Sequence, residues 1–449
     1  MLWSISKRFQ FAADRIIPES FVFCIILTLI AFVLGLFVNG GDALQLVDGW
    51  YSGLWSMIAF AFQMSFMVIT CGVAAKSPAV ARGLAWVAGI PKSPAAAYTV
   101  LLVFGIISSL INWAFSVILT PILAMYLSRS VKGLHFPLMV ASGYSMMILG
   151  QCWCPSASIY ALSASEGHFL EKTIGLITQD VSVFNPVNTI LFFGTFLLIL
   201  FVTIFTRPPQ NEIVPYEGEV TATGHEELDD DEEPSLARSM NRSRALMWLI
   251  GITGLIIIVR SFMSKGILAS LNFNFVIFLF LTLNCFLYNS PSRFLNAYRD
   301  TMRSATDVMI QFPFYGGIMG MMTASGLGKA ISDMLVNVGS VDSFYTLSFL
   351  SAALLNLFIP SQGGQWIVQG PILTEAANSL GAYIPYVMNA FVAGDEVTNL
   401  LQPLYLIPAL ALVGMKLKQA WGICAFLCMF WLLFMGIGFY VLPLMFPGA

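Results

Sequence analysis

The chain has 449 residues, of which 58% are hydrophobic and 10% are charged. Soluble domains carry about 25% charged residues, so the composition excludes an ordinary soluble domain and indicates an all-α polytopic membrane protein. The net charge of −3 is small, and the seven cysteines form no CxxC motif and have no matching histidine set. We therefore expect no metal centre, no cofactor and no nucleic-acid partner.

Apolar runs predict the membrane segments in chain order. The first run is expected to be a span rather than a removed signal peptide, because no small-residue cleavage site follows it. Two runs are too long for one straight helix, and polar residues interrupt both of them. Asn112 breaks one, and the stretch NLFIPSQGGQW at 356–366 breaks the other. The runs are 20–39, 51–75, 97–129, 137–163, 184–206, 246–261, 266–289, 304–326, 343–380, 385–414 and 420–446.

Lysine and arginine concentrate in cytoplasmic loops, so their positions predict the sidedness of the chain. Three basic residues among the first 15 place the N-terminus inside, and the segment 40–50, which has none, is predicted as an outside loop. Arg129 and Lys132 fall inside only if 97–129 is a re-entrant hairpin. The prediction is about nine full spans and two re-entrant hairpins, with the N-terminus cytoplasmic and the C-terminus outside.

An acidic cytoplasmic linker is predicted at 207–245. Its segment 226–233 holds seven of the 24 acidic residues and is typical of a solvated loop. Four arginines in the same linker place it on the cytoplasmic side. A connecting span at 246–261 follows. It places Arg260 and Lys265 on the outside, which is the one exception to the concentration of basic residues in cytoplasmic loops.

The two halves match in sequence as an inverted repeat. Pro121-Ile122-Leu123 corresponds to Pro371-Ile372-Leu373, and in each half a proline that opens a span follows, at 137 and at 385. Each of these spans has another proline 18 residues on, at 155 and at 403. Inverted repeats place binding sites near the membrane midplane, at discontinuous helices.

The repeat divides the chain into two similar parts around the linker and the connecting span. The first repeat is predicted at 1–206, with a hairpin at about 95–130 and a broken helix at about 137–163. The second is predicted at 262–449, with a hairpin at about 343–380 and a broken helix at about 385–414.

The interruption of the second hairpin has the chemistry of an anion site. Non-helical backbone at membrane depth is tolerated only where protein, water or a solute satisfies its polar groups. Paired glycines let backbone N–H groups approach a ligand, and a helix that begins after the tip directs its positive end at an anion. The alternative is an ordinary Gly/Pro loop at the membrane surface. The candidate substrate-binding residues of both halves are Asn112, Gln151, Asn356, Ser361, Gln362, Gly363, Gly364, Gln365 and Trp366.

The second broken helix contains the adjacent acids Asp395 and Glu396. Acidic residues inside a span are expensive and usually functional. One of them is a candidate to bind a proton or a cation, and the other to pair with a donor. Thr398 and Asn399 offer oxygen ligands for Na⁺. The alternative is a structural pair that is hydrogen-bonded within the bundle.

Two long motifs resemble the bacterial short-chain fatty acid transporter family, the acetoacetate/butyrate uptake type. One is QFPFYGGIMGMMTASGL at 311–327, where a proline and paired glycines also predict a kink or close packing. The other is PSQGGQWIVQGP at 360–371, followed by GD, TN and QP pairs between 394 and 403. The chain departs from the family pattern at Gln362, where a glycine is usual, and at Glu396-Val397.

The resemblance implies membership of a larger superfamily of ion transporters. That superfamily includes sodium-coupled dicarboxylate and citrate carriers, which are dimers that move a transport domain against a scaffold. It therefore implies a scaffold plus a transport domain, a homodimer and an elevator-type mechanism. The expected location is the bacterial inner membrane, with the lipid bilayer as the surroundings.

The hypothesis is a secondary active carrier for short-chain fatty acids or other small monocarboxylates, with H⁺ or Na⁺ as the coupling ion. We predict no lysine or arginine at membrane depth within the motifs, which argues against citrate-like substrates because these would need basic partners. An anion channel with re-entrant filter loops is one alternative, and a carrier of a different small carboxylate is another. The predicted spans contain no paired acid and base, no nucleophile with a histidine base and no cluster of metal ligands. We therefore do not expect an enzyme.

Overall fold

The computed structural model describes residues 2–448 apart from 17–18, 39, 112, 156, 165, 169, 219–234, 271–272 and 331–339. Within these residues every regular element is a helix and no strand occurs. Six stretches of the described chain are long and apolar enough to cross a membrane. The prediction of an all-helical, multi-pass membrane protein is confirmed, whereas the count of about nine spans stays a prediction. The six stretches are Phe21–Val38, Ala43–Ala74, Pro94–Ile111, Pro186–Phe205, Leu236–Lys265 and Leu417–Met445.

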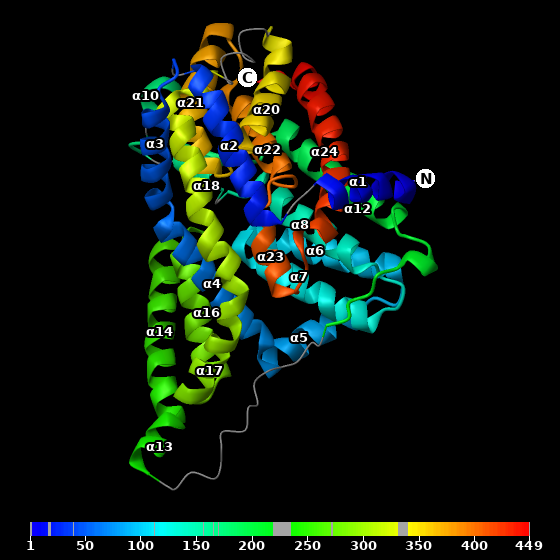
Figure 1. Ribbon diagram of the computed structural model, residues 1–449, viewed down its shortest axis with the longest axis vertical. Coiled ribbons are helices and arrows are strands. Elements are labelled where there is room, and N and C mark those ends of the chain that lie inside the picture. The colour runs from blue at the N-terminus through cyan, green and yellow to red at the C-terminus, as the bar shows by residue number, and fades with distance from the viewer. Residues whose placement is uncertain are drawn as a thin grey trace.

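The chain order of the helices can be followed by colour in Figure 1. In the first half they are α1 Leu2–Ile16, α2 Ser20–Val38, α3 Ala43–Ser56, α4 Ile58–Lys76, α5 Pro78–Ala88, α6 Pro94–Ile111, α7 Trp113–Ser130, α8 Phe136–Gln151, α9 Ser158–Ser163, α10 Glu171–Ile174, α11 Gln179–Ser182 and α12 Pro186–Phe205. In the second half they are α13 Leu236–Asn241, α14 Arg244–Lys265, α15 Ile267–Ser270, α16 Phe273–Leu287, α17 Pro291–Met302, α18 Thr306–Ser325, α20 Val341–Asn356, α21 Gln362–Leu380, α22 Ile384–Thr398, α23 Leu406–Leu412 and α24 Leu417–Met445. Two short 3₁₀ turns lie at Gln210–Glu212 and Arg303–Ala305.

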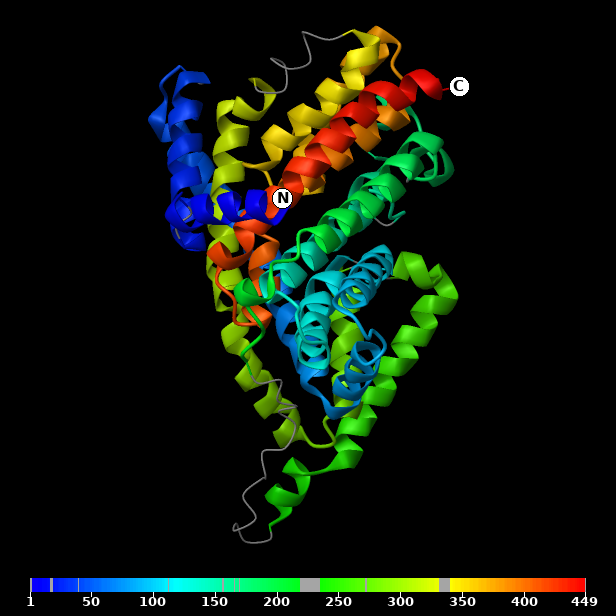
Figure 2. The same cartoon turned by 90° about the vertical axis from the view of Figure 1, so that its right-hand side faces the viewer.

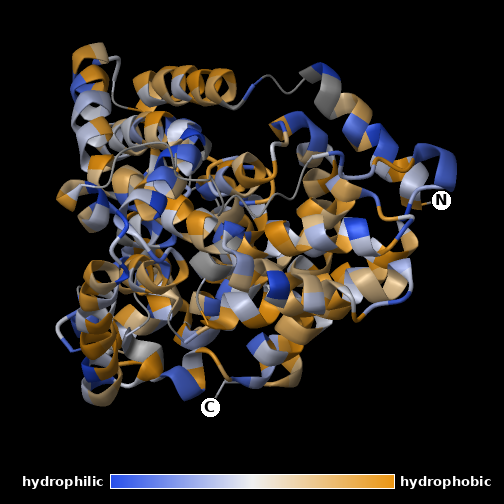
Figure 3. Cartoon of the chain, turned by 90° about the horizontal axis from the view of Figure 1, so that it is seen from below, coloured by the Kyte–Doolittle hydropathy of each residue, from blue (hydrophilic) through white to orange (hydrophobic). Residues whose placement is uncertain are grey.

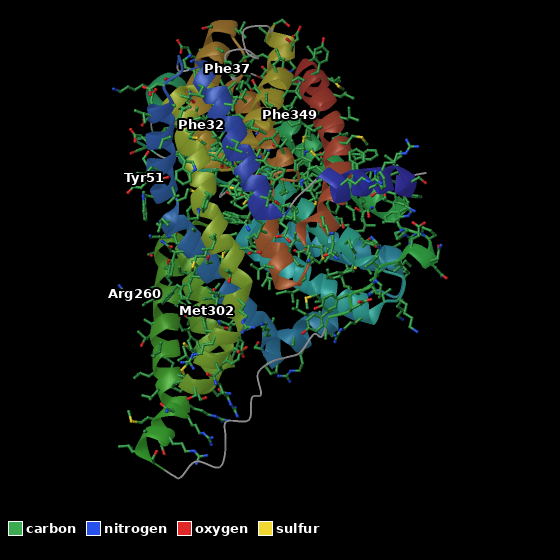
Figure 4. All side chains as sticks on the ribbon, viewed as in Figure 1. Phe32, Phe37, Tyr51, Arg260, Met302 and Phe349 are labelled. Atoms are coloured by element: carbon green, nitrogen blue, oxygen red, sulfur yellow. The ribbon has the colours of Figure 1, made fainter. Side chains whose placement is uncertain are left out.

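Large apolar side chains remain exposed on the outer helices, as lipid contact requires. On α14, Leu249, Ile250 and Ile256 are each more than half exposed. Figure 3 shows hydrophobic residues over most of the helices, seen from below. Arg260 lies at the outer edge of the same helix (Figure 4) and is exposed. A long basic side chain can reach polar surroundings from such a position, so an exception to the charge rule is tolerable there.

Glycines bring α3 and α18 into backbone contact. A Cβ added at Gly53 would collide with the carbonyl oxygen of Gly316, and one added at Gly320 would collide with that of Gly49. Trp50 packs over Gly317 in the same interface. Small residues allow helices in membranes to approach this closely, so the predicted close packing at 316–317 is confirmed.

The expectation of a loop over 40–50 is wrong from residue 43 onward, because α3 begins there. Asp42 caps the helix by accepting a hydrogen bond from the Gln45 N–H at 3.0 Å. The glycine face described above then packs onto α18. The segment lacks the continuous apolar run of a span, which is why its composition suggested a loop.

Two helix pairs and two interrupted helices occupy the regions of the predicted hairpins and broken helices. The pair α6 and α7 is separated at residue 112, and the pair α20 and α21 at 357–361; the members of each pair pack against one another. The helix α8 ends at Gln151 before α9, and α22 ends at Thr398 before α23. Figure 2 shows α20, α22 and α24 side by side, as their contacts require. The assignment of these elements to an inverted repeat stays a prediction.

A buried histidine connects the segment after α12 to the start of α8 by a hydrogen bond. His135 is the N-cap residue of α8, and its Nδ1 accepts a hydrogen bond from the Val214 N–H at 3.0 Å. The ring lies edge-on to Trp3 of α1, whose indole N–H donates to Glu212, and Lys7 pairs with the same carboxylate at 2.9 Å. Burial lowers the pKa of His135 to about 4, against the opposing effect of the Glu212 charge.

We expect this histidine to make the protein less stable as the pH falls from 6.5 to about 4. In that window the unfolded chain binds a proton and the folded chain does not, so the free energy of unfolding decreases by up to about 3 kcal/mol. Thermal unfolding in detergent at several pH values measures the effect. His135→Asn keeps an acceptor for Val214 and should lose the dependence; an unchanged pH profile in this variant would refute the assignment.

Candidate functional site

The second hairpin turns at a break that the sequence imposes. Proline at 360 disfavours helical backbone at Ile359, and α20 ends at Asn356. Ser361 has extended backbone and caps α21, because its hydroxyl oxygen accepts a hydrogen bond from the Gly364 N–H at 3.4 Å. The first N–H groups of a helix have no partner within it. The tip residues 361–364 are only half-buried, so the positive end of α21 is partly exposed.

Asn356 ties the end of α20 to the break after α22. Its side-chain amide donates to Thr398 Oγ1 at 3.1 Å and to Asn399 Oδ1 at 2.9 Å, and it is fully buried. The Thr398 hydroxyl in turn donates to the Ala353 carbonyl at 2.8 Å. These bonds occupy oxygens of Thr398 and Asn399 that the sequence suggested as Na⁺ ligands. The hydroxyl and amide oxygens nevertheless remain within one polar cluster, so a role for them at a cation stays a prediction.

Glu396 connects this cluster to the hairpin tip. Its carboxylate accepts one hydrogen bond from the Gln362 side chain at 3.0 Å and another from Asn399 at 3.2 Å. The side-chain Oε1 of Gln362 accepts a hydrogen bond at 3.4 Å from the backbone N–H of Ile159, in the first turn of α9. The tip of the second hairpin is therefore linked to the interruptions in both broken helices. Gln362, which departs from the family pattern, makes both links.

Asp395 has no such partners. The residue is 1% exposed, and neither carboxylate oxygen has a hydrogen-bond partner among the described residues. An unpaired carboxylate in an apolar environment is strongly unfavourable, so a proton or a cation is needed to compensate it. Among the groups that the structure describes, no cluster of three metal-ligating side chains surrounds it. The two adjacent acids thus differ, because Glu396 is satisfied by amides and Asp395 is not.

Gln365 and Trp366 lie inside the hairpin rather than at its tip. The Gln365 amide donates to the Ala352 carbonyl at 2.9 Å and to Gln369 Oε1 at 3.0 Å, so its donors are engaged within the hairpin. Trp366 is 1% exposed and packs edge-on against Phe391, with 4.8 Å between ring centroids. Contact of either side chain with a substrate stays a prediction that requires the hairpin to move.

The two candidate residues of the first half stay predictions. Asn112 lies outside the described residues. Gln151 is the buried last residue of α8. The described bond from α8 to the second break comes instead from Tyr144, whose hydroxyl donates to the Asn399 carbonyl at 3.0 Å.

A second polar cluster was not anticipated. Asn389 of α22 donates to the Tyr160 hydroxyl at 2.9 Å and accepts from the Asn185 amide at 2.7 Å. Asn185 also caps α12 by accepting a hydrogen bond from the Asn188 N–H. An asparagine inside the apolar run at 385–414 was the available signal for the other bonds.

A double-mutant cycle is expected to show that Gln362 and Glu396 stabilise one another. Gln362→Ala and Glu396→Ala each remove the bond between the tip and α22, so their combined effect on the free energy of unfolding should be smaller than the sum by about 1 kcal/mol. The measurement is thermal or denaturant unfolding in detergent. Gln362→Ala combined with Asp307→Asn, an exposed position on α18, should be additive; additivity in the first pair would show that the bond contributes nothing.

An all-helical, multi-pass membrane fold with helix ends and carboxyl groups buried among its helices is typical of membrane transporters. A family model described as short chain fatty acid transporter matches residues 1–442. The chain therefore belongs to the short-chain fatty acid transporter family, and it is not an enzyme.

Two relatives carry the name "Putative short-chain fatty acid transporter". The one from Escherichia coli is 30% identical over 428 residues, covering 94% of this chain and 96% of the relative. The one from Haemophilus influenzae is 29% identical over 453 residues, covering 98% and 100%. Among solved structures, the Alcanivorax borkumensis YdaH transporter is similar, with a TM-score of 0.45 and 16% identity, over 94% of this chain and 98% of that chain.

Proposed function

We propose that the protein is a secondary active carrier for short-chain fatty acids or other small monocarboxylates. The observation that carries the proposal is the half-buried N-terminus of α21, which Ser361 caps. A hydrogen bond from Gln362 to Glu396 joins it to the end of α22. Helix N-termini bind anions through free N–H groups and the helix dipole. A monocarboxylate needs only such dipoles, whereas a dianion or a trianion would call for arginine or lysine.

The coupling ion in this proposal is H⁺ or Na⁺, bound at Asp395. The carboxyl group is buried without a described partner, and it lies one residue from Glu396, which contacts the tip. Neutralising Asp395 lowers the unfavourable energy of moving this region through apolar surroundings. Occupation of the substrate site and of the ion site would then favour the same movement.

The proposed movement is an elevator-type exchange between the two sides of the membrane. The segments that would carry the site are the helix pairs α6–α7 and α20–α21 and the interrupted helices α8 and α22, related as an inverted repeat. The remaining helices would form a scaffold within a homodimer. We further propose the inner membrane as the location, with the N-terminus cytoplasmic and the C-terminus outside.

Uptake of labelled butyrate into proteoliposomes tests the proposal. A carrier shows saturable uptake, counterflow against unlabelled butyrate, and accumulation driven by a proton or sodium gradient. Imposing each gradient separately identifies the ion. Flux that rises without saturation and lacks counterflow would instead indicate a channel, and absence of flux would reject this substrate class.

A further inference from the structure

A cavity of about 350 Å³ lies away from the site described above, between the start of α5 and the turn that joins α16 to α17. Its wall includes Arg82 of α5 and Arg293 of α17, together with Asn289 and Phe286. Two arginines that face one small cavity repel each other unless an anion lies between them. The cavity therefore brings together two positive charges whose compensation has to be found.

Neither arginine is neutralised by a carboxylate within the described chain, where the one ion pair is that of Lys7 with Glu212. Arg82 uses Nε to donate to the Pro78 carbonyl at 3.1 Å. The Nε of Arg293 is buried and has no hydrogen-bond partner among the described residues. A guanidinium group without an acceptor on the chain is unfavourable, so the positive charge of Arg293 lacks compensation from the described residues.

Two helix N-termini add to the positive potential. Ser77 caps α5 and Ser290 caps α17. Ala79 and Arg293, from the first turns of these helices, line the cavity. The first turn of a helix leaves N–H groups without intrahelical partners and carries the positive end of the dipole.

We propose that this cavity binds an anionic phosphate group. A carboxylate has two oxygens, which one arginine fork satisfies, whereas a phosphate offers further oxygens to a second fork and to helix N–H groups. The group has two possible sources, an anionic phospholipid headgroup or a soluble phosphate. Phe286 lies edge-on to Trp248 of α14, with 6.1 Å between ring centroids, and Trp248 is about half exposed. Tryptophan is enriched at the level of lipid headgroups, so a phospholipid fits the same edge of the molecule.

The test compares the full-length protein with Arg82→Gln/Arg293→Gln. Arg299→Gln/Arg303→Gln removes the same charge from exposed positions nearby and is the matched control. Native mass spectrometry measures retention of dioleoylphosphatidylglycerol against dioleoylphosphatidylcholine, and thermal shift measures stabilisation by inorganic phosphate against chloride at equal ionic strength. Arg82→Gln alone, at an exposed position, serves if the double variant does not fold.

We expect the double variant to bind the phosphate ligand about tenfold more weakly than the wild type or the control. If the double variant loses binding of phosphatidylglycerol alone, the site belongs to a lipid headgroup. If it loses stabilisation by inorganic phosphate alone, the site belongs to a soluble phosphate. Equal binding of both ligands by the double variant and the wild type would overturn the proposal.

Discussion

Asp395→Asn is expected to abolish ion-driven accumulation of substrate while leaving the protein folded. The amide has the shape of the carboxyl group but cannot exchange a proton and carries no negative charge to balance a cation. Both Asp395 oxygens are buried without a described partner, so a neutral amide should be tolerated and the melting temperature should be unchanged or higher. The gradient-dependent part of butyrate uptake should fall by roughly 100-fold, the upper range of coupling between two binding events.

Glu396→Gln is the matched control for this prediction. Its carboxylate is held by Gln362 and Asn399, so the change should weaken substrate affinity and retain the response to the gradient. Counterflow, which needs no net ion movement, should survive in Asp395→Asn if the hairpin still binds substrate. Gradient-driven accumulation in Asp395→Asn equal to that of the wild type would remove this residue from the coupling mechanism.

Gly53→Ala is expected to destabilise the protein strongly, because the added methyl group meets backbone atoms of α18. The new Cβ would meet the Gly316 carbonyl oxygen and the backbone of Gly320. Backbone cannot rotate away as a side chain can, so α3 and α18 must separate, with a loss of about 3 kcal/mol. The melting temperature in detergent measures the effect.

The control is Gly83→Ala on α5. A Cβ at Gly83 meets no atom within 4 Å, and alanine in a helix is favoured over glycine by about 0.5–1 kcal/mol. The two variants add the same group to helices and should change the melting temperature in opposite directions. A melting temperature of Gly53→Ala equal to that of the wild type would show that the two helices are not in backbone contact.

The sequence predicted the helices well at two long and uninterrupted apolar runs. The runs at 184–206 and 246–261 correspond to α12 and α14, because lipid exposure requires continuous hydrophobicity. The segment at 40–50 was predicted wrongly because its helix is stabilised by glycine packing against α18, which is a tertiary effect. The amphipathic helix α1 was missed because its charged residues interrupt the apolar pattern.

Within the site, the sequence located the polar residues better than it described their partners. The helix interruption at 357–361 follows from proline and glycine chemistry, which is local. The inward orientation of Gln365 and the link from Gln362 to Ile159 depend on how α20, α21 and α9 meet. The difference between Asp395 and Glu396 has the same origin, since adjacent residues point to different sides of a helix.

Substrate protection of a cysteine placed at the hairpin tip tests the central claim most directly. An added Cβ at Gly363 would lie 3.9 Å from Ser158, so Gly363→Cys should fit at this half-buried position, and the seven native cysteines are all buried. In a preparation that transports butyrate, butyrate should slow maleimide labelling of Gly363→Cys and leave that of Gly83→Cys unchanged. Equal labelling rates at position 363 with and without saturating butyrate would contradict a carboxylate site at the start of α21.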